Sequence, residues 1–229
     1  MGVLLLLQAV AACSNENNAE NRIGNAQVGA ETATAPNPSA TQEGRLVLAF
    51  GDSLYAGYGL EPEQSFPAVL ERVLDARGIG VAVHNAGVSG DTSAAGLRRL
   101  AFTLDGLPRK PDLALVNLGG NDMLRGIDPA ETRANLIAIC EELRKRGIPI
   151  LLTGMVAAPN MGRDYADAFN PIYADLARQF DAGLYPFFLD GVIGDRLLML
   201  PDSVHPNARG IDIIAGKVAP MVADRLKDY

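Results

Sequence analysis

The chain has 229 residues, of which 48% are hydrophobic and 21% are charged. This composition is typical of one globular domain with a well-buried core. The net charge of −7 and the absence of a dense lysine and arginine stripe argue against a nucleic-acid-binding protein. Because no stretch of about 18 apolar residues occurs, we expect no transmembrane helix.

The first 12 residues are predicted to be a lipoprotein signal peptide. An apolar run over residues 3–10 leads into Val10-Ala11-Ala12-Cys13, which resembles a bacterial lipobox. In such a sequence the cysteine is lipidated and becomes the first mature residue, so Cys13 is the candidate lipidation site. Ser14 is typical of sorting to the outer membrane, and we expect a periplasmic, lipid-anchored protein. The alternatives are an uncleaved apolar tail and a soluble periplasmic protein.

Residues 13–44 are predicted to be a disordered tether. They are rich in Asn, Ala, Glu, Thr and Pro and contain almost no large apolar residue, so they cannot bury enough surface to offset the entropy lost on ordering. A flexible chain of about 30 residues reaches on the order of 30 Å, which would hold a domain clear of a lipid surface. Residues 45–229 are predicted to form the folded domain.

From residue 45 onward, short apolar runs alternate with helical patterns. Five runs have the length and composition of strands buried on both faces: residues 45–50, 80–84, 112–118, 149–155 and 184–189. The clearest helix covers residues 129–146, with Asp128 as N-cap and Glu131 closing a capping box. A last helix is expected over residues 207–226. This alternation predicts a three-layer α/β/α domain with a parallel sheet.

The second cysteine, Cys140, is predicted to be a buried hydrophobic residue. It shares a helical face with Leu136, Ile139 and Leu143. A disulfide with Cys13 is not expected if Cys13 is acylated, and no metal-site spacing is present.

Candidate functional residues follow the predicted strands at their carboxyl ends. Ser53 follows the first strand, Gly90 the second and Asn121 the third. Asp202 and His205 lie in the loop after the fifth strand. Ligands bind outside the carboxyl ends of the strands in open parallel sheets, so we expect all five residues at one edge.

Ser53, His205 and Asp202 are the residue types that nucleophilic catalysis requires. A serine hydroxyl needs an imidazole to take its proton and a carboxylate to hold the imidazole in the right tautomer. Ser53 also fits a helix N-cap, and Asp202 also fits the cap of the following helix. The other histidine, His84, is interpreted as a hydrogen-bonded structural residue.

Three groups are candidates for an oxyanion hole, the set of donors that binds the negative oxygen of a tetrahedral intermediate. They are the backbone N–H groups of Ser53 and Gly90 and the side-chain amide of Asn121. Taken singly, Gly90 and Asn121 are more often turn residues. The aspartates beside these positions are interpreted as turn-stabilising residues.

Four segments, in this order, resemble the motif blocks of the GDSL/SGNH hydrolase superfamily. They are GDSLYAGYG at residues 51–59, NAGVSGDT at 85–92, LGGND at 118–122 and DSVHPN at 202–207. The chain is most similar to the bacterial thioesterase I/lysophospholipase L1/arylesterase branch, and the likeness runs from about residue 45 to the C-terminus.

The resemblance implies a five-stranded, flavodoxin-like parallel sheet and an acyl-enzyme mechanism. Ser53 would be the nucleophile, His205 the base and Asp202 the residue that orients it. The oxyanion donors would be Ser53, Gly90 and Asn121. No metal or organic cofactor is expected. Expected substrates are small-molecule carboxylic esters, aryl esters, acyl thioesters and lysophospholipids. We also expect a monomer that contacts the membrane only through its N-terminal lipid.

Two further features concern the acyl site of that branch. Residues 123–126 resemble its mobile acyl-binding loop, although an ordinary surface turn is the alternative interpretation. Tyr55 stands where many relatives carry a small residue, which raises the question of whether it narrows the acyl site.

Three other functions remain as alternatives. A carbohydrate O-acetyl esterase of the same fold has little support, since the chain has no tryptophan for an aromatic sugar platform. A flavodoxin-like module could bind phosphate at the Gly-rich first turn, but this turn lacks the lysine of a phosphate loop and leaves Asp202 and His205 unexplained. A lipoprotein that kept the fold but lost catalysis is the third.

Overall fold

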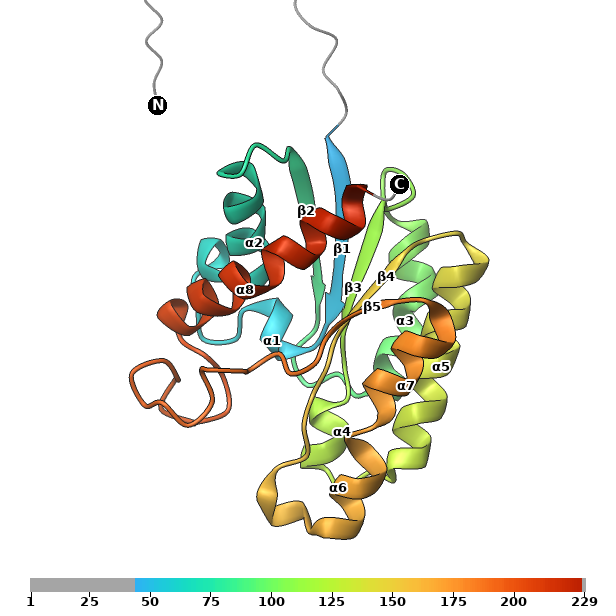
Figure 1. The fold of residues 1–229 in the computed structure, drawn as a ribbon, viewed down its shortest axis with the longest axis vertical. Helices are drawn as coiled ribbons and strands as arrows, with labels where there is room; N and C mark the ends of the chain where they lie inside the picture. The colour runs from blue at the N-terminus through green and yellow to red at the C-terminus, as the bar shows by residue number, and fades with distance from the viewer. Residues whose placement is uncertain (1–43, 228–229) are drawn as a thin grey trace, which may run out of the picture. The chain divides into compact units, whose positions relative to one another are not determined.

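Five parallel strands form a single sheet in the computed structural model, which describes residues 44–227 (Figure 1). In sheet order they are β2 (Val81–Gly87), β1 (Arg45–Gly51), β3 (Leu113–Asn117), β4 (Ile150–Thr153) and β5 (Gly183–Tyr185). This order is that of the flavodoxin-like sheet, and the predicted fold class is confirmed. The predicted signal peptide, Cys13 and all of the predicted tether except Gly44 lie outside the described residues.

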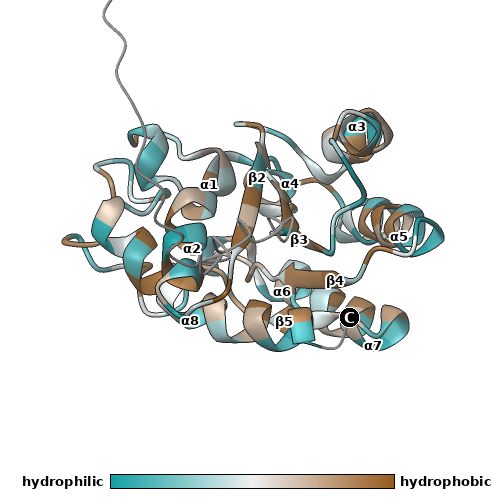
Figure 2. Ribbon diagram, turned by 90° about the horizontal axis from the view of Figure 1, so that it is seen from above, coloured by the Kyte–Doolittle hydropathy of each residue, from teal (hydrophilic) through white to brown (hydrophobic). Residues whose placement is uncertain are grey.

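Helices cover both faces of this sheet. On one face lie α2 (Phe66–Asp75) and α8 (Ala208–Lys227), and on the other lie α3 (Ser93–Asp105), α5 (Pro129–Lys145) and α7 (Ile172–Phe180) (Figures 1 and 2). The shorter elements are α1 (Ser53–Ala56), η1 (Pro62–Gln64), α4 (Gly120–Leu124), η2 (Pro159–Met161) and α6 (Arg163–Phe169). None of the helices in residues 44–227 is long and apolar enough to cross a bilayer.

The central strands are mainly apolar because helices cover them on both sides. Residues 47–50 of β1 and 113–116 of β3 are at most 1% exposed. The expectation of burial on both faces is wrong for β2, an edge strand on which Ala82, His84 and Asn85 are exposed. The His84 side chain has no hydrogen-bond partner among the described residues, so its interpretation as a hydrogen-bonded structural histidine is also wrong.

Several element ends differ from the predicted ones for identifiable reasons. The fifth strand stops at Tyr185 instead of residue 189, because Pro186 has no N–H for the ladder. Asp128 caps α5 by accepting a hydrogen bond from the N–H of Ala130 at 2.8 Å, but the predicted capping box with Glu131 is not formed. Asn207 lies outside α8, where its side chain accepts from the N–H of Gly210 at 3.1 Å.

Cys140 is fully buried in α5, as predicted. Desolvation raises the pKa of its thiol to about 12, against a small lowering by Arg144. The thiol is therefore protonated at neutral pH and packs as a small apolar group.

Candidate active site

Ser53 is the first residue of α1, directly beyond β1. The carboxylate of Asp52 caps this short helix and accepts a hydrogen bond from the N–H of Leu54 at 3.0 Å. Asp52 therefore fills the N-cap position, and the alternative interpretation of Ser53 as the cap is wrong. A side chain at Gly51 would lie 2.8 Å from the carbonyl oxygen of Asn117, so only glycine fits between β3 and the start of α1. The turn leaves the Ser53 hydroxyl at the carboxyl edge of the sheet.

Asp202 and His205 lie in the loop between β5 and α8, on either side of a strained residue. Ser203 has a φ of 58°, a left-handed conformation uncommon outside glycine. Its N–H donates to the carbonyl oxygen of Leu200 at 3.0 Å and closes a turn. The turn brings the Asp202 Oδ2 atom to 2.6 Å from His205 Nδ1. The other oxygen of Asp202 accepts from the N–H groups of Val204 at 2.9 Å and His205 at 3.0 Å.

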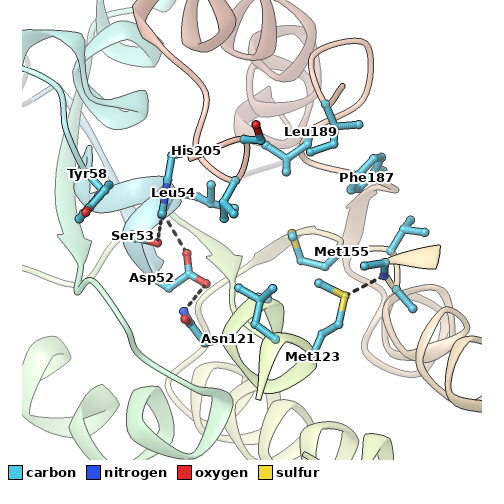
Figure 3. A pocket seen from close by; sticks show the side chains of 18 of the residues that line it. Asp52, Ser53, Leu54, Tyr58, Asn121, Met123, Met155, Phe187, Leu189 and His205 are labelled. Carbon is cyan, nitrogen blue, oxygen red and sulfur yellow. Dashed lines mark hydrogen bonds between the residues drawn. The ribbon is translucent and has the colours of Figure 1, made fainter. Parts of the chain in front are cut away.

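The imidazole of His205 joins this loop to Ser53. Its Nε2 atom lies 2.8 Å from the Ser53 Oγ atom (Figure 3). With a carboxylate at Nδ1, the neutral ring carries its proton on Nδ1 and accepts the serine proton at Nε2. Asn207 caps α8, so the alternative interpretation of Asp202 as that cap is wrong.

The surroundings of Asp202 keep its carboxyl ionised. Desolvation raises its pKa, but the hydrogen bonds from the backbone N–H groups of His205 and Val204 and from the imidazole outweigh this effect. The pKa of Asp202 therefore lies below its ordinary value, and a fixed negative charge faces the Nδ1–H group at neutral pH.

Two backbone N–H groups near Ser53 are free to bind a ligand. Within residues 44–227, neither the Ser53 nor the Gly90 N–H donates to a protein acceptor. Gly90 has a φ of 84°, and its carbonyl oxygen accepts from Arg125 Nη2 at 2.8 Å. Arg125 therefore holds the carbonyl group of Gly90, a residue whose backbone conformation only glycine adopts readily.

The Asn121 side chain lies beside these groups but is already engaged. Its Nδ2 atom donates to the carbonyl oxygen of Asp91 at 3.0 Å. The same atom donates to Asp52 Oδ2 at 3.3 Å (Figure 3). The bond to Asp52 is at the long end of the normal range, so an oxyanion would take that hydrogen more easily.

Two acidic residues, one buried and one half-buried, hold the loops that carry these groups. Asp122 is fully buried and accepts hydrogen bonds from Ser93 of α3 and Thr132 of α5, which fixes α4 and therefore Asn121. Asp91 forms an ion pair with Arg99 at 2.6 Å. These contacts are more extensive than the turn-stabilising role that the sequence suggested.

Asp52 has an unusual environment that the sequence did not reveal. It is 2% exposed, and no Lys or Arg side chain contacts its carboxyl group within the described residues. The pKa of Asp52 is raised to about 7, mainly by desolvation. The hydrogen bonds from Leu54 and Asn121 lower this pKa, and the charges of Asp91 and Asp122 raise it. The carboxyl group between Ser53 and Asn121 thus changes charge near neutral pH.

A cavity of about 800 Å³ opens beside Ser53. Its polar end contains Ser53, Gly90, Asn121 and His205. The remaining wall is mainly apolar and includes Ile193. Figure 3 shows Leu54, Met123, Met155, Phe187 and Leu189 of the same wall. Such a wall suits a hydrocarbon chain better than a sugar.

Two predictions about the acyl site can be compared with this cavity. Met123 and Leu124 end α4 and line the cavity, so this part of residues 123–126 is not an ordinary surface turn. Tyr55 is fully buried, stacks on Phe66 at 4.8 Å and contacts Thr153 through its hydroxyl at 2.8 Å. It does not line the cavity and therefore does not narrow it.

The phosphate-binding alternative finds no support here. The helix α1 has four residues, and the carboxyl group of Asp52 at its start would repel a phosphate when ionised. Residues 44–227 contain no group of three or more His, Cys, Asp or Glu side chains placed to hold a metal ion.

Comparison with known proteins gives consistent matches. The model of the GDSL-like Lipase/Acylhydrolase family matches residues 49–213. Esterase TesA of Pseudomonas aeruginosa is 42% identical over 162 residues, covering 71% of this chain and 80% of that protein. Thioesterase 1/protease 1/lysophospholipase L1 of Escherichia coli K12 is 38% identical over 173 residues, covering 76% of this chain and 81% of that protein. The crystal structure of AlinE4, an SGNH-hydrolase family esterase, is similar with a TM-score of 0.70 and 53% identity, covering 81% of this chain and 98% of that one.

Proposed function

The chain belongs to the GDSL-like lipase/acylhydrolase family and is an ester hydrolase. From this premise we propose that Ser53 is the nucleophile, that His205 is the general base and that Asp202 orients this base. The observation that carries the assignment is the hydrogen-bonded series Ser53 Oγ–His205 Nε2 at 2.8 Å and His205 Nδ1–Asp202 Oδ2 at 2.6 Å. The series opens on an apolar cavity of about 800 Å³.

The first half of the reaction transfers the acyl group to the enzyme. His205 Nε2 takes the Ser53 proton as the oxygen attacks the ester carbonyl, and the carbonyl oxygen becomes negative. Asp202 stabilises the imidazolium that forms and keeps it directed at Ser53. When the tetrahedral intermediate collapses, His205 gives its proton to the leaving alcohol or thiol. The product that remains is an acyl ester of Ser53.

The second half returns the enzyme to its starting state. Water replaces the leaving group, His205 takes a proton from it, and the hydroxide attacks the acyl ester. Collapse of this second intermediate releases the carboxylic acid, and His205 returns the proton to Ser53. Side chains and water carry every proton transfer in this cycle.

The oxyanion is bound by the N–H groups of Ser53 and Gly90 and by the amide of Asn121. Replacing Asn121 by alanine should lower kcat by about 10²- to 10³-fold with little change in KM, because the lost donor acts mainly in the transition state. Steady-state hydrolysis of a p-nitrophenyl ester measures both constants. Asn160→Ala, an exposed asparagine outside the cavity wall, is the control. An Asn121→Ala enzyme with wild-type kcat would remove Asn121 from the oxyanion hole.

The preferred substrates are esters, thioesters or lysophospholipids of fatty acids. The apolar cavity wall supports this assignment, and the assignment agrees with the name of the Escherichia coli relative, thioesterase 1/protease 1/lysophospholipase L1. Because each buried methylene contributes about 0.8 kcal/mol, kcat/KM should rise by up to about fourfold per methylene until the cavity is filled. A series of p-nitrophenyl esters from acetate upward measures this slope. Fastest hydrolysis of the acetate would favour a short-acyl substrate instead.

The protein is active as a monomer attached to the outer membrane through a lipid on Cys13. The lipobox-like residues 10–13 support the attachment, and Ser14 supports the sorting. Gly44 enters the amino end of β1, and Ser53 lies just beyond its carboxyl end, so the seven-residue strand, with a rise of about 3.3 Å per residue, lies between them. The chain therefore enters the described domain at the edge of the sheet opposite to Ser53. Cys13→Ser should release the protein from the membrane fraction, and size-exclusion chromatography tests the monomer.

A fluorophosphonate probe tests the nucleophile directly. Phosphonylation should place a single adduct on the peptide that contains Ser53, as measured by mass spectrometry, because the probe reacts with an activated serine. Labelling should be much slower in His205→Ala, which keeps Ser53 but lacks the base. Wild-type enzyme that hydrolyses esters without labelling, or that is labelled on another serine, would contradict the assignment.

A further inference from the structure

Tyr58 lies in a turn that is built to hold one aromatic ring at the active site. The flanking glycines, Gly57 and Gly59, have φ values of 85° and 72°, a conformation that other residues rarely adopt. The N–H of Tyr58 donates to the carbonyl oxygen of Ser53 at 3.2 Å, and the N–H of Leu60 donates to that of Gly57 at 3.0 Å. The turn is therefore tied to the helix that begins at Ser53.

The ring of Tyr58 packs on the imidazole of His205 (Figure 3). The ring centroids lie 4.4 Å apart, and the planes are tilted by 32°. Tyr58 is 53% exposed, so this aromatic side chain does not serve the hydrophobic core. Its position against His205 needs another explanation, which neither the hydrogen-bonded series nor the oxyanion donors supply.

The same turn contacts the loop of His205 at a second point. A side chain at Gly59 would lie 2.8 Å from the Cδ1 atom of Leu200, so the Leu200 side chain packs closely on the Gly59 backbone. The N–H of Leu200 donates to the carbonyl oxygen of His205 at 2.8 Å, and its carbonyl oxygen accepts from Ser203 at 3.0 Å. The turn therefore supports both the ring of His205 and the backbone that carries it.

We propose that Tyr58 is a positioning residue that holds the His205 imidazole in line with Ser53 and stabilises its charged form. This inference rests on the proposed role of His205 as general base. The ring face of Tyr58 is electron-rich, so it attracts the imidazolium that forms in both halves of the reaction. The stack also limits the ring to tilts that keep Nε2 near Ser53 Oγ.

Few other groups can take this role. Apart from Tyr58, the ionisable or polar side chains of residues 44–227 that contact the imidazole are Asp202 on its own loop and Ser53 on α1. Asp52 lines the same cavity, but its carboxyl group bonds to Leu54 and Asn121. No Lys or Arg side chain lines the described cavity, so the charged ring faces no competing cation.

Substitutions at Tyr58 test the proposal through kcat and KM. Tyr58→Leu, which keeps apolar bulk but removes the ring, should lower kcat by roughly 3- to 10-fold and leave KM nearly unchanged. Tyr58→Phe keeps the ring and should retain wild-type kcat. Phe102→Leu removes another exposed aromatic side chain, 83% exposed and outside the cavity, and serves as the control. Because Tyr58 is exposed, none of these changes should alter the melting temperature greatly.

The choice of ester separates positioning from substrate binding. Each variant is measured with a p-nitrophenyl ester and an alkyl ester of the same acid, and Tyr58→Leu should reduce kcat equally for both. A higher KM confined to the p-nitrophenyl ester would instead make Tyr58 a platform for the leaving group and overturn the proposal. Loss of activity in Tyr58→Phe, or wild-type kcat in Tyr58→Leu, would also overturn it. Failure of wild-type enzyme to react with the fluorophosphonate probe would contradict the proposed function instead.

Discussion

Replacing Ser53 by alanine should lower kcat/KM for ester hydrolysis by about 10⁶-fold, because the change removes the atom to which the acyl group is transferred. The oxyanion donors and the cavity remain, so a residual rate above that in water is expected. Stopped or continuous assays with a p-nitrophenyl ester measure the loss, provided that the enzyme concentration is high enough to detect slow turnover.

Two controls make the Ser53→Ala result specific. The variant should bind a non-hydrolysed ether analogue of the substrate as wild type does, because the cavity wall is unchanged. It should also unfold at nearly the wild-type temperature, since the half-buried hydroxyl makes one hydrogen bond, to His205. Activity within about tenfold of wild type would exclude Ser53 as the nucleophile.

The central sheet could be predicted from the sequence because each of its strands comes from a short continuous run of mainly apolar residues. The apolar runs that became β1 and β3 are buried on both faces, and helical patterns separate them. Exposure of β2 could not be predicted in this way, because it depends on the order of strands in space. A run such as residues 80–84 has the same composition whether it lies at the centre or at the edge.

The arrangement of the site depended on contacts between distant segments. The rule that parallel sheets bind ligands at their carboxyl edge predicted that Ser53, Asn121 and His205 would be neighbours, which they are. The sequence does not predict the left-handed conformation of Ser203, because serine does not favour it. It also does not predict that Tyr58 stacks on His205, because a tyrosine at this position has no preference for that contact. Both features follow from how the last loop packs on the first turn.

Asp52 is the case in which a local interpretation was most incomplete. An aspartate before a helix is an ordinary cap, and Asp52 does cap α1. The sequence could not show that the same carboxyl group is buried near Asp91 and Asp122 without a cation. Burial turns a local capping residue into a group whose ionisation opposes folding.

Replacing Asp52 by asparagine should therefore stabilise the fold at pH 8 and not at pH 4. Desolvation raises the pKa of the folded protein's Asp52 from its ordinary value of 3.8 to about 7. Between these values the folded state holds a proton that the unfolded state has lost, so stability falls as pH rises through the window and the full cost is present above about pH 7. The difference of about 3 pH units corresponds to about 4 kcal/mol in the free energy of unfolding.

The substitution also removes a hydrogen-bond acceptor, and this loss reduces the gain in the free energy of unfolding. The asparagine oxygen can still accept from the N–H of Leu54, but its NH₂ group then faces the NH₂ group of Asn121, at a cost of about 1–2 kcal/mol. Asp52→Asn should thus be less stable than wild type at pH 4 and about 2–3 kcal/mol more stable at pH 8. Its kcat should fall, because Asn121 loses one of its two anchors.

Urea unfolding of both proteins at pH 4 and pH 8 isolates the ionisation of Asp52. The unfolding free energy of Asp52→Asn relative to wild type should increase by about 4 kcal/mol from pH 4 to pH 8. The cost of the mismatched amides is the same at both pH values, so it cancels in that comparison. Asp212→Asn, the same change at an exposed position of α8, is the matched control. If the difference for Asp52→Asn were the same at both pH values, the buried carboxyl would not change its charge in this window. Asp52 would then act on Asn121 as a fixed hydrogen-bond acceptor, and the loss of kcat would be independent of pH.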